Sequence, residues 1–144
     1  MSGSGPRIAI VGGGASGSIV AMNALRHAPD GCQITLIEKR PEIGRGVAYS
    51  TREADHRLNV RASNMSVFSD DSSHFTRWLS DSGIQTTNFD HFYAPRGTYG
   101  DYVADTLKGI AQASGSLCGS STRQPCQSST KEMASQSGWR MDRI

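Results

Sequence analysis

The chain has 144 residues, of which 36% are hydrophobic and 19% are charged, so it can form one packed core. Lys and Arg number 15 and Asp and Glu 13, and a formal net charge of +2 gives no basic field of the kind that binds nucleic acid. The apolar runs are far shorter than the roughly 20 residues that span a bilayer, so no membrane-spanning helix is expected.

Residues 1–6 are predicted to be a flexible Gly/Ser-containing leader without the pattern of a signal peptide. Three cysteines, an odd number with no CxxC pair, predict neither a disulfide framework nor a zinc site. The histidines show no ligand-like spacing, so no metal is expected. These features favour a cytoplasmic protein.

The first elements follow the order strand, glycine turn, helix, strand. Arg7–Val11 is apolar and β-branched, which predicts a fully buried parallel strand. Gly12–Gly17 follows it, Ser18–His27 carries a helical apolar stripe, and Gln33–Glu38 predicts the second strand. The fold class is therefore α/β, with a Rossmann-like βαβ unit and a parallel sheet.

The sequence after Glu38 predicts fewer regular elements. Residues 39–70 are predicted to be a long irregular loop that covers a ligand. Asp70 and Asp71 are expected to precede and cap a short helix, and a further helix is expected from Thr98 to a stop at Gly115. We assign residues 7–112 to the domain and residues 113–144 to an irregular Ser/Gln-rich tail.

The glycine turn carries the clearest chemistry. Gly12 allows a tight turn, Gly14 lets a pyrophosphate approach the backbone, and Gly17 lets the helix pack on the strand. The anion would bind free N–H groups at the positive end of the helix dipole. The predicted cofactor contacts in this segment are Gly12, Gly13, Gly14, Ala15, Ser16 and Gly17.

Glu38 is the predicted ribose ligand, because it ends the second strand about 20 residues after the last glycine. Its carboxylate can accept both ribose hydroxyls of an adenosine, and its charge would repel a 2′-phosphate. NADP is therefore disfavoured at this site, although the adjacent Lys39, also a candidate cofactor contact, weakens that exclusion.

Residues 6–112 resemble the N-terminal part of FAD-dependent flavoproteins with two dinucleotide-binding domains, related to lysine and ornithine N-monooxygenases. The resemblance rests on I-A-I-V-G-G-G-A-S-G, G-R-G-V-A-Y-S-T, H-R-L-N-V-R-A, H-F-T-R-W-L and P-R-G-T-Y-G-D-Y. It implies that FAD is the cofactor and NAD(P)H a co-substrate, and that Arg45 or Asn59 contacts flavin or phosphate oxygens.

The resemblance also implies a longer protein, because such enzymes carry a second domain for NAD(P)H. We therefore expect an incomplete sheet and a module that is inactive alone. Two alternatives remain open: a small NAD-binding dehydrogenase or sensor module, and a non-catalytic fragment.

A truncated or frame-disrupted gene product is expected, because the tail is poor in the apolar strands that should continue the fold. Translating the coding DNA in the other two frames past codon 113 should give strand-like sequence. The expectation fails if neither frame does so and no continuation lies downstream.

Overall fold

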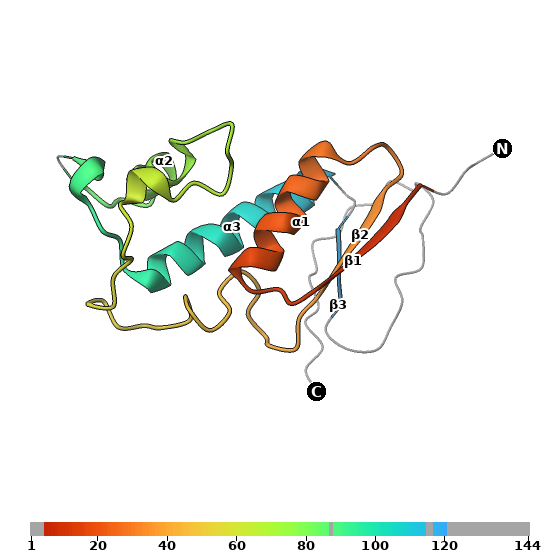
Figure 1. The fold of residues 1–144 in the computed structure, drawn as a ribbon, viewed down its shortest axis with the longest axis horizontal. Helices are drawn as coiled ribbons and strands as arrows, with labels where there is room; N and C mark the ends of the chain where they lie inside the picture. The colour runs from red at the N-terminus through yellow and green to blue at the C-terminus, as the bar shows by residue number, and fades with distance from the viewer. Residues whose placement is uncertain (1–4, 87, 115–116, 121–144) are drawn as a thin grey trace.

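A computed structural model describes residues 5–86, 88–114 and 117–120, the last four by their backbone (Figure 1). The regular elements in these ranges are three strands and three α-helices. They are β1 (Arg7–Val11), α1 (Ala15–His27), β2 (Gln33–Ile37), α2 (His74–Asp81), α3 (Arg96–Ser114) and β3 (Leu117–Ser120), with single 3-10 turns at Ala62–Asn64 and Phe89–His91.

The three strands form one parallel sheet in the order β1-β2-β3, so β2 is central. Ile8 pairs with Ile34 and Ile10 with Leu36, which places these four side chains on one face of the sheet. Helix α1 connects β1 to β2, and α3 leads into β3. The predicted α/β class and βαβ unit are confirmed.

The core lies between that face of the sheet and the helices. Figure 1 shows α1 and α3 packed against one another beside the strands, with α2 at the end of the molecule away from them. Ile34 and Leu36 are each 1% exposed beneath these helices. The core continues toward α2 through buried side chains that include Met22, Phe75, Leu79, Tyr99, Tyr102 and Val103.

The other face of the sheet is largely uncovered by the described residues. Val11 is 82% exposed and its register partner Ile37 is 38% exposed. The prediction that Arg7–Val11 is fully buried is therefore wrong, and Ile8 on the helix-covered face of this edge strand is also 40% exposed. The strand is apolar on both sides, but the described helices pack on one side alone.

The segment beyond residue 113 differs from its prediction where the structure describes it. Leu117–Ser120 forms a parallel strand beside β2 rather than an irregular stretch. These four residues, of which Leu117 is the one large apolar residue, show no strand periodicity, so the pairing comes from their position after α3. The remainder of the tail, the predicted stop at Gly115 and residues 1–4 of the leader lie outside the described residues.

Residues 39–70 are irregular apart from the single turn at Ala62–Asn64, as expected. The expected caps of α2 are not caps: Asp70 pairs with Arg26 and Asp71 with Arg77, while Ser73 occupies the N-cap position. Helix α3 starts two residues earlier than expected. No helix in the described ranges is long and apolar enough to cross a membrane.

Two isoleucines of β2 provide a matched test of the uncovered face. Ile34→Ala should lower the free energy of unfolding by about 2–5 kcal/mol, because it leaves a cavity in the core. Ile37→Ala should cost less than half as much, because its side chain is already partly in solvent. Urea unfolding of both variants measures this, and equal losses would show that the outer face is covered.

Candidate functional site

The glycine turn joins β1 to α1 through three residues. The N–H of Gly12 donates to the carbonyl of Ile37 at 2.8 Å, which ties the turn to the end of β2. Gly12 has a φ of +101°, a conformation that side-chain-bearing residues rarely adopt. Gly14 is the N-cap of α1, and the helix begins at Ala15.

Gly17 lies where α1 passes closest to the turn. A Cβ at this position would lie 1.8 Å from the carbonyl oxygen of Gly12, so any side chain here would displace the turn. The side chain of Ser18, which is buried, also holds the turn by donating to the carbonyl of Gly13 at 3.1 Å. The absence of a side chain at Gly17 therefore allows the start of α1 to pack against the end of β1.

The first turn of α1 is suited to an anion. Gly14 has no side chain to cap the helix, and the first turn contains no acidic residue. The leading N–H groups of a helix have no intrahelical partner, and the helix dipole is positive at that end. Ser16, exposed in this turn, adds a hydroxyl. These groups fit the phosphates of a dinucleotide.

Glu38 lies directly beside this turn. Its carboxylate accepts the N–H of Gly13 at 2.8 Å with one oxygen and the N–H of Arg40 at 3.0 Å with the other. The hydrogen bond from Arg40, with that from Gly13, lowers the pKa of Glu38 below its ordinary value against the opposing effect of desolvation. The side chain is therefore ionised at neutral pH.

An ionised carboxylate has about four acceptor sites on its two oxygens. The hydrogen bonds from Gly13 and Arg40 use one site on each oxygen, so Glu38 retains acceptor capacity for a ribose hydroxyl. Lys39 follows it on the exposed surface. The predicted turn residues and Glu38 are thus brought together.

Arg45 contacts α3 and its own loop, and its predicted contact with flavin or phosphate stays a prediction. Its guanidinium donates to the carboxylate of Asp101 and to the carbonyl of Gly97 at 3.2 Å, and its Nε lies 3.1 Å from Glu42. The side chain is 10% exposed and is directed at α3. The sequence did not predict that Asp101 is the partner of Arg45, because the two residues lie 56 positions apart and no local pattern connects them.

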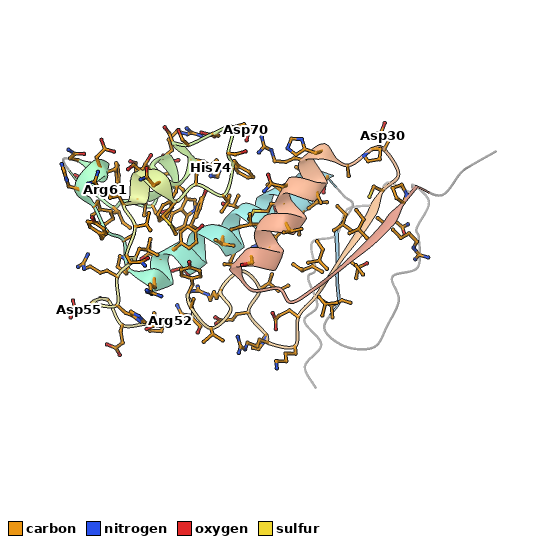
Figure 2. All side chains as sticks on the ribbon, in the orientation of Figure 1. Asp30, Arg52, Asp55, Arg61, Asp70 and His74 are labelled. Carbon is orange, nitrogen blue, oxygen red and sulfur yellow. The ribbon has the colours of Figure 1, made fainter. Side chains whose placement is uncertain are left out.

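Asn59 is not brought to the turn by any described contact. It is exposed and follows Leu58, whose N–H donates to Ala94 at 2.9 Å. Figure 2 shows Asp55 and Arg61, which flank it in sequence, at the end of the molecule away from the strands. Its contact with a flavin stays a prediction.

A separate hollow of about 580 Å³ lies near the C-terminal end of α1 and is called the distal hollow below. Its lining includes Phe68, His74, Trp78 and Thr106. Figure 2 shows His74 and Asp70 on that side of the molecule. A helix C-terminus is negative, and Arg26 there is paired with Asp70 at 2.6 Å, so this hollow suits a pyrophosphate less well than the glycine turn.

A family model described as FAD-NAD(P)-binding matches residues 9–125. The chain is also similar to the crystal structure of Thermovibrio ammonificans THI4, with 17% sequence identity and a TM-score of 0.45. That alignment covers 79% of this chain and 37% of THI4, so the chain spans little more than a third of that protein's length. No curated protein matches the sequence. The family match implies a dinucleotide cofactor.

The hydrogen bonds to Glu38 predict an acid dependence of stability. Because folding lowers its pKa, the carboxylate stabilises the fold above its ordinary value of 4.5 and loses that effect as pH falls through the folded-state pKa. Glu38→Gln should therefore be less stable than wild type at neutral pH, and the difference should shrink below pH 4.5. Thermal melts across this range test it.

Glu53→Gln is the control for that experiment, since Glu53 is an exposed loop glutamate. Its stability should follow wild type at every pH. A gap between wild type and Glu38→Gln that persists unchanged in acid would contradict the assigned role of the two N–H donors.

Proposed function

The chain belongs to the FAD-NAD(P)-binding family, and we propose that it is the FAD-binding module of a flavin-dependent, NAD(P)H-linked oxidoreductase. The observation that carries the proposal is the 2.8 Å hydrogen bond between Gly13 and Glu38. This bond supports the proposal because it brings the Glu38 carboxylate, which could accept ribose hydroxyls, beside the N-terminus of α1, which could bind phosphates. Donors and acceptors for both parts of an ADP group therefore meet at one point.

The ADP half is common to FAD and NAD, so the turn and Glu38 alone do not distinguish the two. The choice of FAD is supported by the motifs that follow β2, which resemble those of flavoproteins related to lysine and ornithine N-monooxygenases. One of them, Gly44–Thr51, begins beside the turn: the N–H of Gly44 donates to the carbonyl of Gly13 at 2.8 Å.

The residues of this chain would bind and orient the cofactor. Glu38 would select a free ribose, because its negative charge repels the 2′-phosphate of NADP, and the glycine turn would hold the phosphates. FAD, when bound, would supply the hydride and electron transfer. We place the reductant and substrate sites outside the described residues, so the module alone should bind cofactor without turning over.

Binding of cofactors to the purified full chain tests the proposal. FAD titration should give saturable quenching of flavin fluorescence, with weaker binding of NADH and the weakest of NADPH. Gly14→Val should weaken FAD binding on the order of 100-fold, because its side chain would fill the space of the pyrophosphate. The valine would also crowd Gly46, because even a Cβ at residue 14 would lie 3.3 Å from the Cα of Gly46.

Gly109→Val is the matched control, because a Cβ there meets nothing within 4 Å. It should bind FAD like wild type, and thermal melts of both variants should establish that each is folded. NADH binding without FAD binding would instead support an NAD-binding module. A chain that binds neither cofactor would support a non-catalytic fragment.

A further inference from the structure

Arg45 is a buried cation whose three side-chain nitrogens are all engaged. Nε contacts Glu42, Nη1 donates to the carbonyl of Gly97, and Nη2 donates to the carboxylate of Asp101. Two of these partners belong to α3 and one to the loop of Arg45 itself. The guanidinium therefore joins the loop that follows β2 to the first turns of α3.

Close backbone packing supports the same junction. A Cβ at Gly44 would lie 2.8 Å from the backbone N of Ala104, and one at Gly100 would lie 2.6 Å from the carbonyl oxygen of Tyr49. The rings of Tyr49 and Tyr99 lie 4.8 Å apart between their centroids. The motif G-R-G-V-A-Y-S-T thus packs along the motif P-R-G-T-Y-G-D-Y of α3.

The opposite side of this loop contacts the glycine turn. The N–H of Gly44 donates to Gly13 at 2.8 Å, and a Cβ at Gly46 would lie 3.2 Å from the Cα of Gly14. Residues 44–46 therefore form a wall beside the position where a pyrophosphate would approach. Arg45, within that wall, has its side chain directed at α3.

We propose that Arg45 is a positioning residue, which holds residues 44–46 against the glycine turn through its ion pair with Asp101 and does not itself contact phosphate. The inference rests on the proposed function, because the wall is useful for a dinucleotide. It also replaces the direct phosphate contact expected from the sequence. If Arg45 bound phosphate, the anion and the Asp101 carboxylate would compete for the same guanidinium.

The two roles predict opposite effects at Asp101. If Arg45 positions the wall, Arg45→Met and Asp101→Ala should each weaken ADP binding to the full chain roughly tenfold, and the double variant should be no weaker than Arg45→Met. If Arg45 binds phosphate, Asp101→Ala would free the guanidinium and strengthen ADP binding, which would overturn the proposal. Isothermal titration with ADP measures both.

Arg52→Met is the matched control, because Arg52 is 69% exposed and forms only a 3.5 Å surface pair with Glu42 among the described contacts. It should bind ADP like wild type. Weakening of the same size in Arg52→Met would indicate a nonspecific loss of positive charge and would also overturn the proposal.

Amide hydrogen exchange separates this proposal from the proposed function, because it needs no ligand. Exchange over residues 44–49 should accelerate in Arg45→Met and Asp101→Ala and stay at the wild-type rate in Arg52→Met. Unchanged exchange in Arg45→Met would overturn the positioning role. The wild-type chain could bind no dinucleotide while exchange still accelerates in Arg45→Met and Asp101→Ala. That result would contradict the proposed function and support the positioning role of Arg45.

Discussion

Helix α1 can begin against the end of β1 because residue 17 has no side chain. Any Cβ there would lie 1.8 Å from the carbonyl oxygen of Gly12, so a larger residue would separate the helix from the strand. The same contact fixes where the free N–H groups of α1 lie. It also sets the distance from those groups to Glu38, since β2 pairs with β1 along its length. The proposed phosphate site at the N-terminus of α1 and the proposed ribose ligand Glu38 thus depend on one close backbone contact.

A second set of close contacts extends the site away from the sheet. The N–H of Gly44 donates to the carbonyl of Gly13. The next residue, Arg45, forms an ion pair with Asp101 of α3. The helix that packs beside α1 therefore also supports the loop that borders the glycine turn. In the proposed arrangement, α3 would influence the cofactor site through the ion pair between Arg45 and Asp101 without contributing a side chain to that site.

Local patterns were sufficient for the first part of the fold. The β-branched run, the glycine spacing and the apolar stripe identify β1, α1 and β2, and the strand end places Glu38 beside the turn, as the 2.8 Å bond to Gly13 bears out. Long-range pairings were not accessible in this way. The partner of Arg45 lies on α3, the acidic pair before α2 binds arginines instead of capping the helix, and Leu117–Ser120 becomes a strand through its place beside β2. Apart from the local pair of Asp71 with Arg77, each depends on residues far away in sequence, which no short period reveals.

The central claim is that an ADP group binds where the glycine turn, Glu38 and residues 44–46 meet. Backbone amide chemical shifts of the full chain, followed during titration with ADP, test it most directly. The largest changes should fall on Gly13–Gly17 and Gly44–Gly46, with a smaller change at Glu38 and little change around the distal hollow. Saturable shifts centred on His74 and Trp78, with the glycine turn unaffected, would contradict the account.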